Sequence, residues 1–457
     1  MTARVLVIAG TGSGVGKTSI SIGIARALSR RGVRVRAAKV GPDFLDPMHL
    51  TLATGTPCIN LDLYMMGEEY VRRLASDAAR DADLLLVEGV MGLFDGARPD
   101  TSEGSTAEVA RVLDAPIVLV ADAWGQARSF AATVFGFVHM ESGLRFPAVI
   151  ANQVGSAGHG ELLDCALRSM ALPPMLAAIP KGGLPSLESR HLGLIAPRSA
   201  TEVDALATAV EATIPLERLM QLAEPLRGAG PQGAAHEAQA SPRTARTSRS
   251  LRLAVAEDSA FGFIYADLRQ AMLSHGVEWI PFSPLKDPAL PPDAEALLLP
   301  GGYPEEHAEE LSANQPMLQS IAEFAARRPV YAECGGLMAL GESLIDRAGR
   351  RHAMAGVLPL VTRMGARTAR LGYAEVTLRT HTLWGNAGAT CRGHEFHYSS
   401  LDAEPPDSLE RAYEVRYRRG ASRHEGFILG RVLASYVHLH LASRPNCLRT
   451  LVEEMAR

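Results

Sequence analysis

Short runs of apolar residues alternate with helical patterns along the first half of the chain. The runs cover residues 5–9, 33–40, 84–87, 117–121, 148–152 and 176–179. Strands that are buried on both faces read as continuous apolar runs, and strands that alternate with helices form parallel sheets. The pattern therefore predicts an α/β domain in which helices cover both faces of a parallel sheet.

A second series of apolar runs begins at residue 251. It covers residues 251–256, 277–282, 296–299 and 330–332, and β-like runs follow at 373–378 and 430–436. The preceding segment, residues 223–250, is rich in Gly, Pro, Ala, Ser and Arg without an apolar period, which is typical of a flexible linker. Because 457 residues exceed one ordinary core, we expect two α/β domains, residues 1–222 and 251–457, joined by this linker.

Composition and charge argue against several classes of protein. The net charge of −4 and the pI near 6.4 give no global basic field, so we expect no nucleic-acid partner. No apolar run reaches the ~18 residues of a membrane span, and the first strand starts too early for a signal peptide. The 5 cysteines are scattered without CxxC spacing, so we expect no disulfide framework or zinc site and predict a cytoplasmic protein.

The segment IAGTGSGVGKTS, residues 8–19, follows the first strand and opens a helix. A Gly-rich turn at a helix start can aim its N–H groups at phosphates, with Lys17 on the outer phosphates and Thr18 on Mg²⁺. We therefore expect ATP to bind at Thr11, Gly12, Gly14, Val15, Gly16, Lys17, Thr18 and Ser19. Thr11 stands where the strict P-loop pattern has glycine, and in this the segment resembles the dethiobiotin-synthetase-like branch of P-loop proteins.

Polar residues follow other strands of the same predicted sheet. Asp43 and Asp46 lie beyond the second strand, Glu88 ends a fully apolar strand, and Asn152 ends another. The carboxyl ends of parallel strands meet at one rim, where Mg²⁺ finds oxygen ligands beside phosphates. We expect Thr18, Asp46 and Glu88 to bind the metal and Asn152 to contact adenine. The alternatives are loop acids, helix caps and a turn asparagine.

The segment VYAECGGLMAL, residues 330–340, places Cys334 between a strand and two glycines. A strand, a nucleophile and a Gly-rich turn form an elbow that exposes the nucleophile and aims backbone N–H groups at one point. His438 ends a later β-like run and could act as base and then acid. N–H groups at Gly302 and Gly335 would form an oxyanion hole. The alternative for Cys334 alone is a buried, inert thiol.

The second half resembles class I glutamine amidotransferase domains, in which a cysteine attacks the side-chain amide of glutamine and releases ammonia. Those domains usually carry His-x-Glu, but this chain has His438-Leu439-His440. The third member of the triad is therefore absent from its usual place. The resemblance implies that Cys334 and His438 act as a dyad, as in the cobyrinic and cobyric acid amidase subgroup.

The chain as a whole resembles the family of cobyrinic and hydrogenobyrinic acid a,c-diamide synthases. The resemblance covers both halves through stretches such as KVGPDFLDP, VEGVMGLFDG, SRHLGL, LLPGGYPE, YAECGG, RGHEFHYS and SYVHLH. It implies ATP- and glutamine-dependent amidation of the a- and c-acetate carboxylates of the corrin ring through acyl phosphates, in cobalamin biosynthesis. Asp43 and Asp46 then become candidates for positioning the acceptor carboxylate. Abundant Ala and Arg give a slight preference for the metal-free acceptor, hydrogenobyrinic acid.

Other functions stay open on the sequence alone. A nickel-sirohydrochlorin a,c-diamide synthase shares the same motifs, whereas a P-loop switch or partition-type ATPase would leave Cys334 unexplained. The segment RGHEFHYS offers Arg392, His394, Glu395 and His397, which could bind an acidic corrinoid, join the domains, or lie on an ordinary polar strand. Edge-strand pairing between second domains could produce a homodimer.

Overall fold

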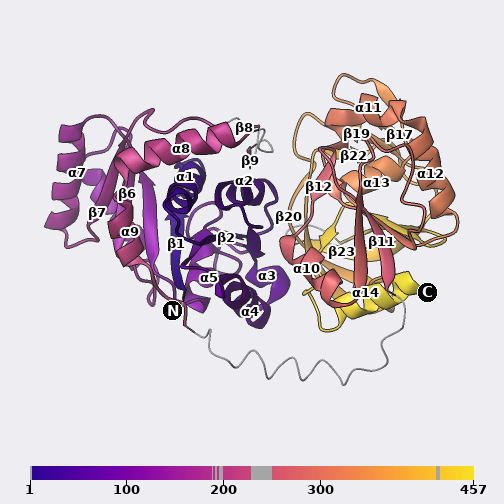
Figure 1. Cartoon of the computed structure of the whole chain (residues 1–457), viewed down its shortest axis with the longest axis horizontal. Helices are drawn as coiled ribbons and strands as arrows, with labels where there is room; N and C mark the ends of the chain where they lie inside the picture. The colour runs from indigo at the N-terminus through magenta and orange to yellow at the C-terminus, as the bar shows by residue number, and fades with distance from the viewer. Residues whose placement is uncertain (1–2, 188, 191–192, 195–198, 228–249, 418–421) are drawn as a thin grey trace. The chain divides into compact units, whose positions relative to one another are not determined.

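The chain folds into two compact units. The computed structural model describes residues 3–187, 189–190, 193–194, 199–227, 250–417 and 422–457. The units are Met1–Pro242 and Arg243–Arg457, each drawn in Figure 1. Ala223 is buried and Glu224–Pro225 (β10) pairs with the first strand, so the first residues of the expected linker pack in the first unit. The rest of that linker, residues 228–249, lies outside the described residues.

A parallel sheet forms the centre of the first unit. Its strand order is β3-β2-β4-β1-β5-β6-β7, and β10 joins β1 antiparallel. The strands are β1 (Arg4–Gly10), β2 (Val35–Val40), β3 (Ile59–Leu61), β4 (Leu84–Glu88), β5 (Ile117–Asp122), β6 (Ala148–Val154) and β7 (Met175–Pro180). The chain adds strands on both sides of β1, so a switch point lies at the carboxyl end of this central strand. The predicted parallel sheet is confirmed, with the phosphate-loop motif at that point.

Helices cover this sheet. They are α1 (Lys17–Arg30), α2 (Leu45–Thr54), α3 (Leu63–Met66), α4 (Glu68–Ala79), α5 (Thr106–Val112), α6 (Arg128–His139), α7 (Ala157–Ser169), α8 (Ala200–Thr213) and α9 (Leu216–Leu222). α1 begins in the phosphate-loop motif and packs against α8 (Figure 1). Of the SRHLGL stretch, Ser189–Arg190 (β8) pairs with Gly193–Leu194 (β9), and His191 and Leu192 lie outside the described residues.

The second unit contains a mixed sheet with the order β13-β11-β14-β16-β25-β24-β23-β20-β21-β26. Its strands are β11 (Leu251–Ala256), β13 (Val277–Phe282), β14 (Ala296–Leu299), β16 (Val330–Glu333), β20 (Arg370–Leu378), β21 (Thr390–His397), β23 (Glu410–Tyr417), β24 (Arg423–Leu429), β25 (Val432–Ser435) and β26 (His438–Leu439). The neighbours from β13 to β25 are parallel, and the others are antiparallel. β26 is last in this order, and the N–H of its Leu439 donates to Glu333 at the carboxyl end of β16.

Smaller elements complete the second unit. The short strands are β12 (Phe261–Phe263) with β15 (Gly301–Gly302), and a four-stranded sheet of β17 (Ser343–Ile345), β18 (Arg351–Ala353), β19 (Val361–Met364) and β22 (Ser399–Leu401). The helices are α10 (Ala266–Ser274), α11 (Ala308–Ala313), α12 (Gln315–Ala325), α13 (Gly335–Leu340) and α14 (Cys447–Ala456), with a short 3-10 turn at Pro304–His307. The expected α/β class is confirmed for both units.

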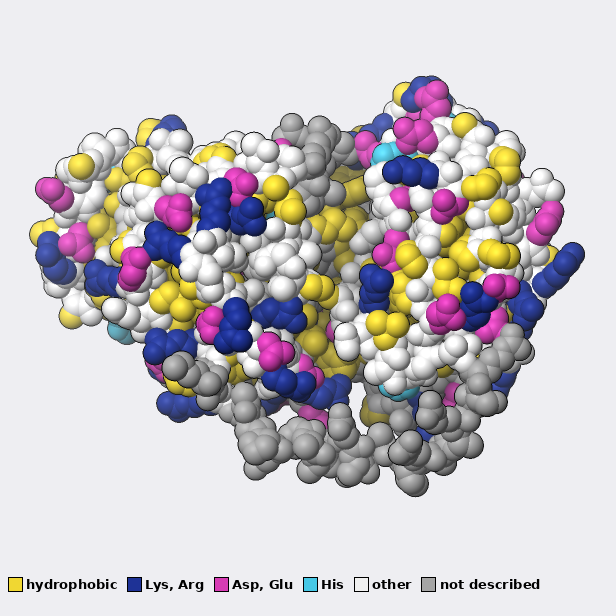
Figure 2. All heavy atoms as spheres, viewed as in Figure 1, with side chains coloured by type: hydrophobic (Ala, Val, Ile, Leu, Met, Phe, Trp, Pro, Cys, Tyr) yellow, Lys and Arg dark blue, Asp and Glu magenta, His cyan; other side chains and the backbone are white. Residues whose placement is uncertain are grey.

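The surface drawn in Figure 2 carries charges of both signs. On the drawn face of each unit, Lys and Arg side chains lie among Asp and Glu side chains, with scattered hydrophobic groups between them. Fields from such mixed charges cancel within about a Debye length, ~8 Å at physiological ionic strength. Among the described residues, no helix combines the length and apolar character that a membrane crossing requires.

Two helical glycines provide a matched test of the packing between α1 and α8. A Cβ at Gly23 would lie 2.4 Å from Val210 Cγ2 and 2.9 Å from Leu206 O, whereas a Cβ at Gly136 in α6 would meet nothing within 4 Å. Alanine should stabilise a free helix position by about 0.5–1 kcal/mol, but overpacking costs about 1–3 kcal/mol. We expect Gly136→Ala to raise the urea midpoint and Gly23→Ala to lower it. Equal effects of the two substitutions would contradict the close packing.

Candidate functional sites

The phosphate-loop motif forms a tight turn between β1 and α1. Gly16 has φ 93° at the start of α1, in the left-handed region that favours glycine. The N–H of Thr11 donates to Val120 O at 2.9 Å, so this donor is engaged by β5. A Cβ at Gly12 or Gly14 would meet nothing within 4 Å, so this part of the turn is open. The loop can therefore receive a ligand around Gly12 and Gly14.

Asn152 fixes the loop from within β6, which continues to Val154 instead of ending at Asn152 as we expected from the sequence. Its Nδ2 donates to Val15 O at 2.9 Å, and its Oδ1 accepts from the N–H of Gln153 at 2.9 Å. A Cβ at Gly16 would lie 2.3 Å from Asn152 Nδ2, so the side chain and loop are in direct contact. The structure thus gives Asn152 a part in holding the loop, and the expected adenine contact stays a prediction.

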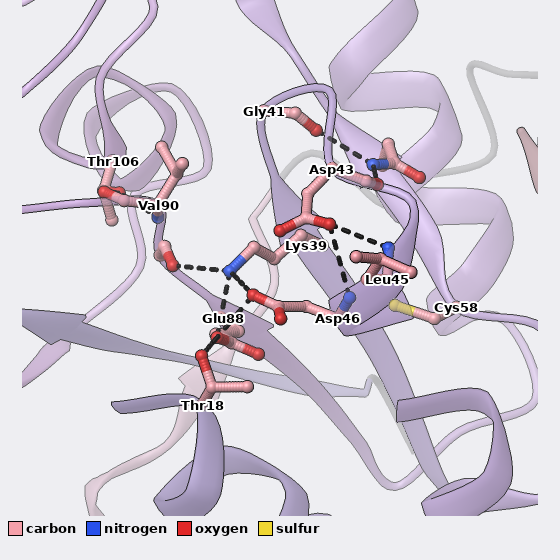
Figure 3. Close-up of polar contacts among 12 residues, drawn as sticks. Thr18, Lys39, Gly41, Asp43, Leu45, Asp46, Cys58, Glu88, Val90 and Thr106 are labelled. Atoms are coloured by element: carbon pink, nitrogen blue, oxygen red, sulfur yellow. Dashed lines mark hydrogen bonds and ion pairs between the residues drawn. The ribbon is translucent and has the colours of Figure 1, made fainter. Parts of the chain in front are cut away.

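A buried lysine, which the sequence reading did not select, joins the predicted acidic residues. Lys39 on β2 is 2% exposed, and its Nζ donates to Asp46 Oδ2 at 2.6 Å, Glu88 Oε1 at 2.9 Å and Gly89 O at 3.1 Å. Figure 3 shows the ammonium between the two carboxylates, with the hydroxyl of Thr18 donating to Glu88. The structure therefore brings Thr18, Asp46 and Glu88 together, as we expected from the sequence. The Lys39 ammonium at the centre of this cluster was not expected.

The charges in this cluster stabilise one another. Burial acts to lower the pKa of Lys39, but the carboxylates of Asp46 and Glu88 raise it above its usual range. Burial acts to raise the pKa of Asp46, whereas the Lys39 ammonium lowers it. Burial raises the pKa of Glu88. Burial, and then the nearby Lys39 charge, lower the pKa of Lys17. Two lysines thus converge on the rim where a phosphate-bearing ligand would lie.

Asp43 has a structural role. Its Oδ1 accepts from the backbone N–H groups of Leu45 at 2.8 Å and Asp46 at 3.3 Å, in the first turn of α2 (Figure 3). These contacts are those of a helix cap, one of the alternatives on the sequence. Burial, and then the neighbouring Asp46 charge, raise the pKa of Asp43 to about 7. A catalytic role for Asp43 stays a prediction.

Some oxygen atoms in this cluster fit a divalent cation. Glu88 Oε2 is buried and has no hydrogen-bond partner among the described residues. An unsatisfied carboxylate oxygen beside a threonine hydroxyl matches the oxygen ligands that Mg²⁺ prefers. No three His, Cys, Asp or Glu side chains within the described ranges form a group that could hold a metal alone. A metal here would therefore need the Thr18 hydroxyl and ligand oxygens as well.

Cys334 lies in a strained turn at the end of β16. Its φ of 45° and ψ of −99° are unusual for a residue with a side chain. The N–H of Cys334 donates to Ser435 O at 2.7 Å, which ties the turn to β25. Strain held in this way is typical of nucleophile elbows. The predicted elbow is therefore present, although Cys334 is only 5% exposed.

Glycines allow a second loop to approach this turn. A Cβ at Gly335 would lie 3.0 Å from Gly302 N, and a Cβ at Gly336 would lie 2.0 Å from Leu299 O. A Cβ at Gly301 would lie 2.4 Å from His438 Cε1. The predicted oxyanion residues Gly302 and Gly335 therefore lie together next to Cys334.

His438 interacts with two consecutive residues, Glu333 and Cys334. Its Nδ1 lies 3.3 Å from Glu333 Oε2. Burial acts to lower the pKa of His438, but hydrogen bonds to Cys334 and Glu333 raise it to about 10. A carboxylate thus contacts His438, although position 440, where related domains carry the triad glutamate, is a histidine. The sequence signal for this carboxylate was in the YAECGG motif, where Glu333 directly precedes Cys334.

One residue of the RGHEFHYS segment, His394, lies in the same site. His394 on β21 pairs with His438 on β26, and the two rings stack with centroids 4.9 Å apart. Neighbouring residues of a strand face opposite sides, so Glu395 points away from His394. Its carboxylate accepts from Tyr417 and Arg423. His397 stacks on Tyr436 with centroids 4.0 Å apart. His394 therefore belongs to the Cys334 site, and Arg392 is exposed.

Glu425 supports the segment that carries His438. It accepts from the N–H of Tyr436 at 2.8 Å and from the hydroxyl of Ser435, and it is buried. Burial raises the pKa of Glu425 to about 7. The carboxyl group under the turn between β25 and β26 therefore takes up a proton at a higher pH than an ordinary glutamate does.

Comparisons with known proteins match a family model to each of the two units. Residues 6–194 match the CobQ/CobB/MinD/ParA nucleotide binding domain, and residues 252–446 match the CobB/CobQ-like glutamine amidotransferase domain. The cobyrinate a,c-diamide synthase of Syntrophotalea carbinolica is 49% identical, over 98% of both chains. The chain belongs to the cobyrinate a,c-diamide synthase family.

Other relatives in this family carry two names. The hydrogenobyrinate a,c-diamide synthase of Mesorhizobium japonicum is 40% identical and covers 89% of this chain and 92% of its own. The cobyrinate a,c-diamide synthase of Salmonella typhimurium is 39% identical and covers 97% of this chain and 96% of its own. This family member thus combines a nucleotide-binding and a glutamine amidotransferase domain, as the sequence motifs predicted.

Removing the buried cation should be costly. Lys39→Met keeps a similar side-chain length but leaves Asp46 and Glu88 as unpaired, buried carboxylates. Breaking a buried ion pair from one side costs about 3–5 kcal/mol, and we expect urea unfolding to show a loss of this size. Adding Glu88→Gln to Lys39→Met should recover part of the lost stability, because one of the unpaired buried charges is then removed. A Lys39→Met protein as stable as the wild type would contradict the proposed charge balance.

The Glu425 carboxyl group should make stability depend on pH. Its folded pKa of about 7 exceeds its ordinary value of 4.5, so the protonated group stabilises the fold at low pH. This contribution should disappear as pH rises from 4.5 through 7. Glu425→Gln does not titrate, so the stability of wild type relative to Glu425→Gln should fall by roughly 1–3 kcal/mol over this range.

Urea midpoints at several pH values would measure this difference. Glu410→Gln, at an exposed position on the neighbouring β23, provides the baseline. A wild-type minus Glu425→Gln difference that is flat with pH would contradict a protonated Glu425.

Proposed function

We propose that the chain amidates the a- and c-acetate carboxylates of a corrinoid acid, with ATP as the activator and glutamine as the nitrogen donor, in cobalamin biosynthesis. The observation that carries this proposal is the pairing, in one chain of this family, of a phosphate loop with clustered carboxylates and a Cys–His elbow with two Gly-rich loops. One half activates a carboxylate, and the other produces ammonia.

The first unit would carry out phosphoryl transfer. A carboxylate oxygen of the acceptor attacks the γ-phosphorus of ATP, the bond to the β–γ bridging oxygen breaks, and an acyl phosphate and ADP result. Lys17 and the backbone N–H groups near Gly14 would stabilise negative charge on the phosphates. Lys39 holds Asp46 and Glu88 in place. Mg²⁺, held by Thr18 and a carboxylate of Asp46 or Glu88, would supply charge neutralisation when bound.

The second unit would release ammonia from glutamine. The Cys334 thiolate attacks the side-chain amide carbon, and N–H groups at Gly302 and Gly335 would stabilise the oxyanion. His438 donates its proton to the departing nitrogen, so ammonia leaves and a glutamyl thioester remains. Water then attacks the thioester, His438 accepts its proton, and glutamate departs. Ammonia attacks the acyl phosphate, phosphate leaves, and an amide forms.

The acceptor is proposed to be cobyrinate or hydrogenobyrinate. Relatives with either name align over most of the chain. The same motifs would serve nickel-sirohydrochlorin, so that acid is the comparison substrate. A switch ATPase would need neither glutamine nor Cys334, and the elbow at Cys334 favours the amidotransferase.

We also propose a cytoplasmic location and a homodimeric assembly. The described cysteines are all free, in keeping with the cytoplasmic location that the sequence predicts. β13 and β26 are the edge strands of the second sheet, and the longer of them, β13, is our candidate for pairing in the predicted homodimer.

Amidation assays with separated nitrogen donors test this function. Purified protein with ATP and Mg²⁺ would receive each of the three acids with glutamine or ammonium, and mass spectrometry would count amides. We expect two amidations of a corrinoid acid. Cys334→Ala should lose glutamine-dependent amidation at least about 100-fold and keep ammonium-dependent amidation. Lys17→Met should lose both by a similar factor and still hydrolyse glutamine.

A matched control uses another cysteine. Cys165 is exposed in the first unit, and Cys165→Ala should keep both activities. ATP hydrolysis without amidation of any tetrapyrrole would overturn the corrinoid assignment. Full glutamine-dependent activity in Cys334→Ala would overturn the nucleophile.

A further inference from the structure

The carboxylate of Glu333 is held firmly beside His438. Glu333 is the last residue of β16 and directly precedes Cys334. Its Oε1 accepts from the Tyr331 hydroxyl at 2.6 Å and from the N–H of Leu439 at 3.1 Å. Its Oε2 lies 3.3 Å from His438 Nδ1. Two donors thus fix one oxygen, and the second oxygen faces the imidazole.

The strained turn lets two successive side chains reach one ring. In an extended strand, successive side chains point to opposite faces. The φ of 45° at Cys334 breaks this alternation, and His438 interacts with both Glu333 and Cys334. Because Nδ1 faces Glu333, Nε2 is the nitrogen left for Cys334.

His440, at the position where related domains carry the acid, is occupied elsewhere. Its Nδ1 accepts from the N–H of Ala442 at 3.1 Å, and its Nε2 lies 3.4 Å from Asp267 Oδ2 on α10. Its ring also packs edge-on against Tyr265, with centroids 5.0 Å apart. His440 therefore binds to α10 and leaves the Nδ1 side of His438 to Glu333.

The remaining titratable neighbour of His438 carries no competing charge. His394 stacks on the ring of His438, and its Nδ1 lies 3.2 Å from the Tyr265 hydroxyl. Burial, and then the nearby His438 and His440, hold the pKa of His394 well below its usual range. A neutral ring thus restricts the plane of His438, and among the described residues the titratable side chains discussed around that histidine are Cys334, Glu333, His394 and His440.

We propose that Glu333 is the positioning residue for His438 and takes the place of the glutamate that ordinary triads carry two residues after the histidine. Glu333 accepts a hydrogen bond from Nδ1–H, so Nε2 keeps the lone pair that receives the Cys334 proton. The carboxylate then stabilises the imidazolium that forms. This role rests on the proposed glutaminase chemistry of Cys334 and His438.

Glu333→Gln tests the role with little change in shape. The glutamine oxygen can still accept from Tyr331 and Leu439, which turns its NH₂ group toward His438 Nδ1. That donor favours the tautomer with hydrogen on Nε2, which cannot take a proton from Cys334. We expect kcat for glutamine hydrolysis to fall by roughly 10²–10⁴-fold, with KM for glutamine changed by less than about threefold. Glu333→Asp should recover part of kcat.

Alkylation of Cys334 gives a readout that a purely structural role would not move. Iodoacetamide reacts with the thiolate, and peptide mass spectrometry would follow Cys334 over a pH series, with exposed Cys165 as the internal reference. In Glu333→Gln we expect the Cys334 reaction rate at pH 7 to fall about tenfold and its midpoint to move to higher pH. Glu342→Gln, at an exposed position after the elbow helix α13, should match the wild type.

A measurement on a chain that retains Glu333 covers the case in which Glu333→Gln fails to fold. In Cys334→Ala, ¹⁵N-histidine NMR reports which nitrogen of His438 carries hydrogen, and His438→Gln assigns the signal. Hydrogen on Nδ1 is the expected result, either in the neutral ring or in the imidazolium, and a neutral ring with hydrogen on Nε2 alone would overturn the proposal. The proposal would also be overturned if Glu333→Gln kept the wild-type kcat and the wild-type alkylation rate of Cys334. This outcome counts against Glu333 alone when Cys334→Ala and His438→Gln are inactive, because the proposed glutaminase chemistry then still holds. Glutamine hydrolysis by Cys334→Ala would instead remove the proposed function.

Discussion

Both candidate sites depend on close backbone approach at the carboxyl ends of parallel strands. In the first unit, Gly16 lies against Asn152, where a Cβ would be 2.3 Å from Nδ2. In the second, a Cβ at Gly336 would be 2.0 Å from Leu299 O. Glycine is the residue that fits such contacts, and loops held this tightly can aim backbone N–H groups at one point. The close approach therefore places Lys17 and Cys334 beside donors that stabilise negative charge.

The same rims require charges to be buried, and each site balances them locally. Lys39 is buried between Asp46 and Glu88, and His438 lies between Cys334 and Glu333. A buried charge without a partner would cost several kcal/mol, so each site needs its opposite charge in place before a substrate arrives. This need for an opposite charge explains why Glu88 and Glu333 each end an otherwise apolar strand. Preorganised charges of this kind also need little rearrangement during a reaction.

The sequence predicted those features that depend on short-range patterns. Apolar runs gave the strands, and Gly-rich turns with Lys17 or Cys334 gave both loops. Lys39 was missed because one lysine inside an apolar run gives no sign of its partners, which come from β4 and α2. Asn152 was selected by its place at a strand end, but its contact with Val15 depends on the packed loop. Contacts between distant segments are set by packing, which no local pattern encodes.

Glu333 shows the same limit most clearly, since its bond to the Leu439 N–H joins residues 106 positions apart. A motif search looks for the triad acid at a fixed distance from the histidine, but the chemistry requires only a carboxylate at Nδ1. Placing that acid next to the nucleophile has a physical advantage. One strained turn then orients both Glu333 and Cys334, so the imidazole needs to dock against a single segment. With the acid supplied from β16, position 440 is free to bind α10 through Asp267, which anchors the strand that carries His438.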